Sequence, residues 1–358
     1  MGVNYGILGD NLPTPTQAIA LMQKQGITQA RIYDTNPSVL TAFQGSNIQI
    51  IVGVLNEEIL AIGEDNATAS KWVKDRIVPF ASTCNITCIA VGSEVLTAEP
   101  TLGALLVPAM EFLHTALVSF GLDSMIKVSS PQSTDLLTST FPPSTGTFNS
   151  NFSMAIVQPM LDFLSQTGSF YMLNVYPHRA FQQNPQIITL DYALFHPNPG
   201  VIDSANGFVY TNAFDALLDA TYTAMAGLNH TDLTILVSET GWPSQGETTE
   251  NGVSPSNAQT YNSNVVKHVL NKTGSPGRPG VVISTYVFEL FNEDKKDGPA
   301  SARNFGLFNA DMSPVYAIDL SGSGILLDNS PPAASANRTW CVAKQVSDLS
   351  LSSIYEDM

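Results

Sequence analysis

Basic residues are scarce in this chain of 358 residues, where 15 Lys and Arg stand against 31 Asp and Glu and the formal net charge is -16. That charge repels phosphate backbones and anionic lipid, so it disfavours nucleic acid as a partner and favours a neutral ligand. Charged residues make up 13% of the sequence and hydrophobic residues 44%, a balance typical of a folded protein with a large core.

Long apolar runs are also lacking, because the apolar stretches are strand-sized and interrupted by polar residues. We therefore expect no transmembrane segment. No basic and apolar leader precedes the first strand-like segment, so either the protein is cytosolic or a signal peptide is missing from this form of the chain. Secretion is favoured by six Asn-X-Ser/Thr sequons, at Asn66, Asn85, Asn151, Asn229, Asn271 and Asn337.

Cysteine is rare, and the three present, Cys84, Cys88 and Cys341, are an odd number that cannot all pair within the chain. A bridge between Cys84 and Cys88 requires the intervening chain to turn back, because an extended segment holds the two Cα atoms too far apart. No histidine lies near them in sequence, and the five histidines show no spacing typical of metal ligands. We expect no metal site and no cofactor.

Short β-rich apolar segments recur, and helical patterns lie between them. Eight strands are predicted, at 3–7, 30–34, 49–54, 88–94, 127–130, 171–176, 234–239 and 281–290. Helices are predicted at 15–25, 37–44, 64–80, 101–120, 151–167, 211–228 and 256–271. Alternating strands and helices imply parallel strands joined by right-handed crossovers.

Eight such units fit an α/β fold of the (β/α)8 (TIM) barrel type, with a doubly wound open sheet as the competitor. Polar residues at the strand ends favour the barrel, because all its loops after the strands open on one face, where active sites lie. Tyr33, Asn174 and Tyr176 are among these strand-end residues.

The barrel is predicted to occupy residues 1–319 as a single domain. Residues 320–339 are rich in Ser, Pro and Ala, a composition typical of a linker. Residues 340–358 are too few to build a further domain, so we expect a disordered C-terminal tail.

Two strand-ending carboxylates stand out, Glu94 in AVGSEVL and Glu239 in LVSETGWPSQG. At the ends of the fourth and seventh barrel strands they would face one another across the mouth. Glycoside hydrolysis uses such a pair, with one carboxyl group as acid and the other as nucleophile or base, and a separation of about 5–5.5 Å signals retention. A single strand-end carboxylate is more often structural, paired with an arginine near the barrel rim, and we expect Arg31 to pair with some acid in this way. Two such carboxylates together favour an enzyme.

The segment 233–246, LTILVSETGWPSQG, resembles the signature of glycoside hydrolase family 17, the plant β-1,3-glucanases. The resemblance extends along the chain through GVNYG at 2–6, RIYD at 31–34, NVYP at 174–177, FELFNE at 288–293 and FGLF at 305–308. The first of these usually stands just after a signal peptide, which favours a secreted, cell-wall protein. A membrane anchor in a longer form of the protein is left open.

The resemblance implies a monomeric barrel that cleaves internal β-1,3 linkages of callose-type or laminarin-type glucans with retention. It implies Glu239 as nucleophile and Glu94 as acid/base. Among the substrate-binding residues, it places Tyr176 beside the nucleophile and Tyr33 in the cleft. Glu293 and Lys296 match an auxiliary acid and base that shape the site electrostatically. Ser93, Asn174 and Phe291 complete the expected substrate contacts, although core packing is at least as good an explanation for Phe291.

Three features of the sequence depart from the family pattern. Ser93 replaces a usual Asn before the acid/base, Ala302 replaces a frequent Glu, and His178 with Arg179 stand where aromatic residues are usual. These departures keep two alternatives open, a β-glucan-binding protein without hydrolytic activity and a transglycosylase. The tail around Cys341 resembles the truncated start of a carbohydrate-binding module that we expect not to fold.

Overall fold

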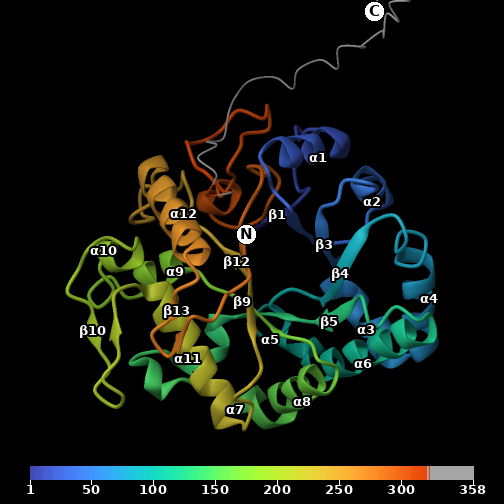
Figure 1. Cartoon of the computed structure of the whole chain (residues 1–358), viewed down its shortest axis with the longest axis horizontal. Coiled ribbons are helices and arrows are strands. Elements are labelled where there is room, and N and C mark those ends of the chain that lie inside the picture. The colour runs from blue at the N-terminus through green and yellow to red at the C-terminus, as the bar shows by residue number, and fades with distance from the viewer. Residues whose placement is uncertain (321, 323–358) are drawn as a thin grey trace, which may run out of the picture.

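Figure 1 shows a computed structural model of the protein, which describes residues 1–320 and 322. The predicted linker and module remnant, with Asn337 and Cys341, lie outside the described residues apart from Leu320 and Gly322.

One parallel sheet forms the centre of the molecule, in the order β5-β4-β3-β2-β1-β15-β12-β9-β6. Its strands are β1 (Gly2–Tyr5), β2 (Gln29–Ile32), β3 (Gln49–Val54), β4 (Asn85–Val91), β5 (Lys127–Ser129), β6 (Pro131–Ser133), β9 (Tyr171–Asn174), β12 (Ile235–Thr240) and β15 (Thr285–Val287). Only Ser130 separates β5 from β6, so the two ends of the sheet are neighbours along the chain. The sheet therefore closes into a barrel of eight parallel segments, and the prediction of a (β/α)8 barrel is confirmed.

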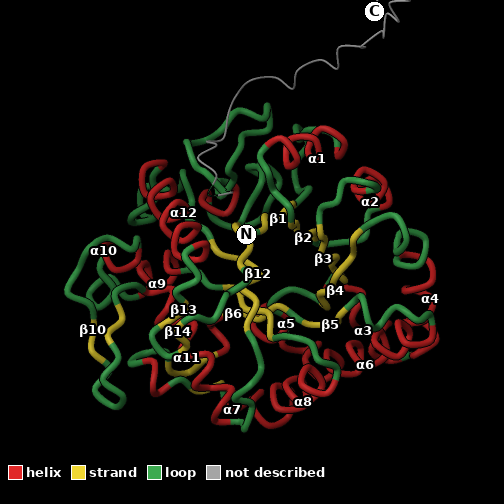
Figure 2. The backbone as a smooth tube through the Cα atoms, viewed as in Figure 1, coloured by secondary structure: helices red, strands yellow, loops and turns green. Residues whose placement is uncertain are grey.

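Helices surround this ring of strands (Figure 2). They are α1 (Pro15–Lys24), α2 (Pro37–Phe43), α3 (Ile59–Glu64), α4 (Asn66–Arg76), α5 (Val95–Ala98), α6 (Gly103–Ser119), α7 (Ser150–Phe152), α8 (Gln158–Gln166), α9 (Pro177–Gln183), α10 (Leu190–Ala193), α11 (Ala213–Gly227) and α12 (Pro255–Leu270). The helix predicted over 64–80 is shorter and begins later. Its cap is Asp65, whose carboxylate accepts from the backbone N–H groups of Ala67 and Thr68 and so separates α3 from α4.

Three small antiparallel hairpins lie outside the barrel sheet and were not predicted. They are β7 (Leu137–Ser139) with β8 (Thr147–Phe148), β10 (Val201–Ile202) with β11 (Val209–Tyr210), and β13 (Gly274–Ser275) with β14 (Arg278–Pro279). Each strand has only two or three residues, too few to show an alternating pattern.

The barrel strands bury apolar side chains on both faces of the sheet, because alternate residues of a strand face opposite sides. Ile50 and Val52 of β3 pack outward among the helices, whereas Ile51 packs inward with a small cluster that includes Cys88 and Met172. The described cysteines, Cys84 and Cys88, are both buried and free, so they form no disulfide with each other.

One apolar helical stretch, Pro100–Ser119, is long and apolar enough to cross a membrane by length and composition alone. The expectation that no run reaches that length is therefore wrong. The stretch includes α6, which packs on the barrel through buried residues such as Leu106, Met110 and Leu113. Its apolar composition follows from this packing.

Candidate active site

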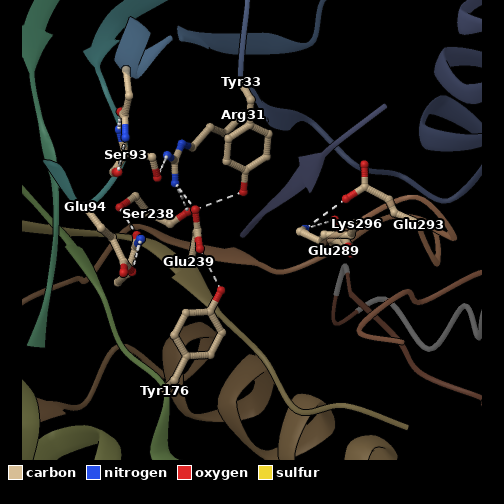
Figure 3. A network of polar contacts seen from close by, with 12 residues as sticks. Arg31, Tyr33, Ser93, Glu94, Tyr176, Ser238, Glu239, Glu289, Glu293 and Lys296 are labelled. Carbon is tan, nitrogen blue, oxygen red and sulfur yellow. Dashed lines mark hydrogen bonds and ion pairs between the residues drawn. The ribbon is translucent and has the colours of Figure 1, made fainter. Parts of the chain in front are cut away.

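Glu239 lies in β12 at the mouth of the barrel, and three donors hold its carboxylate (Figure 3). Its Oε1 accepts from Arg31 Nη1 at 2.7 Å and from the Tyr33 hydroxyl at 2.9 Å. Its Oε2 accepts from the Tyr176 hydroxyl at 2.7 Å. Glu239 is only 7% exposed. Both of its carboxylate oxygens therefore depend on these donors in place of water.

The donors around Glu239 keep their protons. Burial and the facing Glu239 raise the pKa of Tyr33 and of Tyr176 well above the ordinary value. Burial alone would lower the pKa of Arg31, but the facing Tyr33 and Glu239 raise it. Arg31 is 1% exposed and lies over the Tyr33 ring, with 4.7 Å between Cζ and the ring centroid. The arrangement stabilises a negative charge on Glu239.

Glu94 follows β4 in the left-handed backbone region, with φ of 52°. Its Oε1 accepts from Asn174 Nδ2 at 2.8 Å, and Asn174 Oδ1 in turn accepts from the Ser238 hydroxyl at 2.7 Å. Burial and the negative charge of Glu239 raise the pKa of Glu94. The two carboxyl groups thus have different surroundings, because three donors contact Glu239 whereas Glu94 has a raised pKa.

A second charged cluster lies on the other side of Glu239 from Glu94 (Figure 3). Lys296 Nζ is 3.2 Å from Glu289 Oε2 and 2.9 Å from Glu293 Oε2, and it lies 4.0 Å from the centroid of the Phe288 ring. Burial raises the pKa of Glu289 well above its ordinary value although Lys296 opposes the shift. Burial also acts to raise the pKa of Glu293, but hydrogen bonding with Glu289 and the charge of Lys296 outweigh it and lower the pKa.

Two adjoining cavities of about 320 and 310 Å³ form the cleft at these residues. Both are lined by Ser93, Glu239, Phe288 and Lys296. The first continues past Tyr33, Asp34 and Glu293, and the second past Glu94, Tyr176, Arg179, Ala302 and Phe305. Glu239 therefore lies where the two cavities meet.

The positions that depart from the family pattern have different surroundings. The Ser93 backbone N–H donates to Asn56 Oδ1 at 2.8 Å, and its hydroxyl lies 3.4 Å from Arg31 Nη2. His178 turns into the core, where it is 3% exposed and packs edge-on against Trp242. Burial lowers the pKa of His178 to about 4, so it is neutral above that pH. Arg179 and Ala302 line the second cavity.

The prediction that Phe291 contacts substrate needs correction. Phe291 is 1% exposed and packs against Tyr5 and Phe308, and neither cavity includes it. Its ring faces the core because the chain turns after β15, which leaves Phe288 as the phenylalanine of FELFNE that lines the cleft. The other expected substrate contacts that line the cavities are Tyr33, Ser93, Tyr176, Glu293 and Lys296, while Asn174 is 1% exposed and contacts Glu94.

Sequence reasoning missed two residues of this site. The sequence predicts an acid partner for Arg31 without identifying it, and it assigns no role to Glu289 in the motif FELFNE. The sequence separation of 208 between Arg31 and Glu239 leaves no local pattern that names the partner. Within residues 1–320 and 322, no group of three or more His, Cys, Asp or Glu side chains is placed to hold a metal ion.

Comparison with known proteins gives consistent results. The sequence profile described as Glycosyl hydrolases family 17 matches residues 1–320. Glucan endo-1,3-beta-glucosidase 3 of Arabidopsis thaliana is 44% identical over 351 residues, which cover 97% of this chain and 69% of that protein. The solved structure of CJP38, a beta-1,3-glucanase and allergen of Cryptomeria japonica pollen, aligns with a TM-score of 0.86 and 43% identity over 90% of this chain and 99% of that chain. A plant beta-glucan endohydrolase structure aligns with a TM-score of 0.82 and 36% identity, over 89% of this chain and all of that one.

Proposed function

This chain belongs to the glycosyl hydrolases of family 17, and from that premise we propose that it hydrolyses internal β-1,3 linkages of β-1,3-glucans with retention of configuration. The observation that carries the proposal is the pair of carboxyl groups at one cleft, Glu239 held by three donors and Glu94 with a raised pKa. A retaining glycosidase needs an ionised nucleophile beside a protonated acid.

In the proposed first step, Glu239 attacks the anomeric carbon of the sugar bound at the junction of the cavities. Glu94 gives its proton to the glycosidic oxygen, so the leaving sugar departs neutral and a glycosyl-enzyme ester forms on Glu239. In the second step the ionised Glu94 takes a proton from water as the water oxygen attacks the same carbon. The Glu239–carbon bond breaks, which restores both carboxyl groups.

The surrounding residues support these two roles. Arg31, Tyr33 and Tyr176 stabilise the negative charge that returns to Glu239 when the ester breaks. Lys296 lies on the cleft wall between Glu289 and Glu293 and supplies a positive charge near the reacting centre. We infer that its electrostatic contribution depends on both acids.

Two alternatives remain distinct from hydrolysis. In transglycosylation a second sugar replaces water in the second step, and the second cavity is where such an acceptor would bind. A glucan-binding protein without hydrolytic activity would use the same cleft but release no product. Analysis of the products from laminarin separates the three functions. Hydrolysis gives only shorter sugars, transglycosylation gives longer sugars as well, and binding alone leaves laminarin unchanged.

The first prediction tests the nucleophile. Glu239→Gln is expected to lower the rate of laminarin hydrolysis on the order of 10^4-fold, because the neutral amide forms no glycosyl-enzyme ester. Reducing-end release measures the rate, and calorimetric titration with a short β-1,3-glucan tests whether binding persists. Activity within tenfold of the unchanged chain would reject Glu239 as nucleophile.

Azide distinguishes the two carboxyl groups by stereochemistry. With Glu239→Ala, azide attacks the activated substrate directly and gives an α-glycosyl azide. With Glu94→Ala, azide attacks the glycosyl-enzyme and gives a β-glycosyl azide. An activated aryl glycoside serves as substrate in both cases, because its leaving group needs no proton. The same anomer from both variants would overturn the assignment.

We further propose that the protein is a secreted monomer of the cell wall. The five sequon asparagines among the described residues, Asn66, Asn85, Asn151, Asn229 and Asn271, are all exposed, as glycan attachment requires. Expression with a secretory leader, followed by glycosidase treatment and light scattering, tests glycosylation and oligomeric state.

A further inference from the structure

Arg179 lies beside the proposed acid/base and pairs with a second acid. It is in the first turn of α9, and its Nη1 lies 3.8 Å from Glu94 Oε2 while its Nη2 lies 2.8 Å from Asp135 Oδ2. The Arg179 side chain is 46% exposed and lines the second cavity. Arg179 has no role in the two steps proposed for the reaction.

The two oxygens of Glu94 have different surroundings. Oε1 accepts from Asn174, which is itself fixed by Ser238. Oε2 is left for exchanging a proton with the substrate, and it is the oxygen that faces Arg179. A cation near this oxygen stabilises its ionised form and opposes its protonated form.

The charges around Glu94 come from several elements. Glu239 on β12 and Asp135 after β6 disfavour a negative charge on Glu94, and Arg179 favours it. The balance changes during the proposed reaction, because ester formation removes the charge of Glu239 while Arg179 stays positive. Glu94 then faces less negative charge in the second step, in which it must act as an ionised base.

We propose that Arg179, held by Asp135, is a positioning residue that moves Glu94 toward its ionised form and so sets the upper pH limit of the first step while assisting the second. The proposal rests on the proposed function for its catalytic consequence. The ion pairs themselves and the titration of Glu94 do not depend on that function.

The sign of the pH effect follows from the chemistry. The first step needs protonated Glu94, so kcat/KM falls as the pH rises through the pKa of Glu94. Arg179→Met removes a charge that lowers this pKa, so the alkaline limb of kcat/KM should move up by about 0.5 to 1 pH unit, the size expected for a half-exposed charge near 4 Å. Asp135→Asn removes a charge that raises it, so the limb should move down. Arg179→Lys keeps the charge and should restore most of the original profile.

Rates under saturation give a second measurement. With an activated aryl glycoside, for which the second step limits the rate, Arg179→Met should lower kcat several-fold while kcat/KM near the acidic optimum changes little. Lys71→Met is the matched control, because it removes one exposed positive charge on the outer helix α4. It should change neither kcat nor the pH profile of kcat/KM.

Direct titration tests the proposal without relying on activity. Carbon NMR of glutamate labelled at the side-chain carboxyl, with the Glu94 signal assigned by its loss in Glu94→Gln, follows the carboxyl group against pH. Opposite shifts for Arg179→Met and Asp135→Asn support the proposal. Unchanged titration, or shifts in the same direction, overturns it. A chain that cleaves no laminarin overturns the proposed function alone, because the titration still decides the role of Arg179.

Discussion

At the scale of single residues, the ion pair between Arg31 and Glu239 connects the stability of the barrel with its proposed chemistry. Both side chains are nearly inaccessible, and their closest atoms are 2.7 Å apart. A buried charge that loses its partner is costly, whereas a pair removed as a whole often costs little. We therefore expect a large loss of stability when only one member of the pair is replaced, and a smaller loss when both are replaced.

This expectation gives a stability prediction. Arg31→Met should lower the free energy of unfolding by about 3 kcal/mol, because Glu239 would keep a buried charge without its cation. The midpoint of urea unfolding measures the change. Glu239→Gln added to Arg31→Met should recover a large part of the loss, since the amide needs no counter-charge. Two independent, additive losses in the double variant would contradict this account.

The positions of individual residues were predictable from the sequence where the signal was local. Glu94 and Glu239 stand at the ends of recognisable strands within motifs, and the structure brings both to one cleft. Phe288 and Phe291 come from the same motif, but only the path of the chain after β15 decides that Phe288 lines the cleft and Phe291 enters the core. The sequence alone does not show which of the two phenylalanines lines the cleft.

At the scale of elements, the repeated order of strand and helix made the barrel predictable. All eight predicted strands are present, because each is a short apolar segment whose residues pack on both faces of the sheet. The ends were less predictable, since the segment 281–290 contains only three strand residues, Thr285–Val287. Hydrogen bonding with neighbouring strands sets such limits, and neighbours in the barrel come from distant parts of the sequence.

The start of α11 offers a test of how one helix is fixed. Asn212 is 4% exposed, its Oδ1 accepts from the Asp215 N–H at 2.8 Å, and its Nδ2 donates to Asp215 Oδ2 at 2.8 Å. Asn212→Ala should lower stability by about 1 to 2 kcal/mol, because it leaves an N–H at the helix start without a partner. The change should appear as a fall of a few degrees in Tm by calorimetry.

A conservative substitution provides the control for this cap. Asn212→Ser keeps a side-chain oxygen able to accept from the Asp215 N–H, so its Tm should lie closer to that of the unchanged chain. Equal losses for Ala and Ser would show that the cap hydrogen bond is not what Asn212 contributes.

At the scale of the whole molecule, barrel closure brings the charged residues together. Glu94, Tyr176 and Glu239 come from three segments that are far apart along the chain, and they meet because parallel strands direct their carboxyl ends to one face. Two cationic side chains line the second cavity, and each faces two acids. Arg179 faces Glu94 and Asp135, and Lys296 faces Glu289 and Glu293. These cations therefore give the cleft little net positive charge to offset the molecular charge of -16.

The molecular charge leads to a prediction about substrate choice. A β-1,3-glucan substituted with carboxymethyl groups should be cleaved several-fold more slowly at about 10 mM salt than one carrying neutral hydroxyethyl groups at the same density, because a negative protein repels a negative polymer. The hydroxyethyl polymer controls for the bulk of the substituent. At about 1 M salt the Debye length falls from about 30 Å to about 3 Å, so the two kcat/KM values should converge. A ratio that does not change with salt would mean that contacts within the cleft, and not the field of the whole molecule, reject the charged polymer.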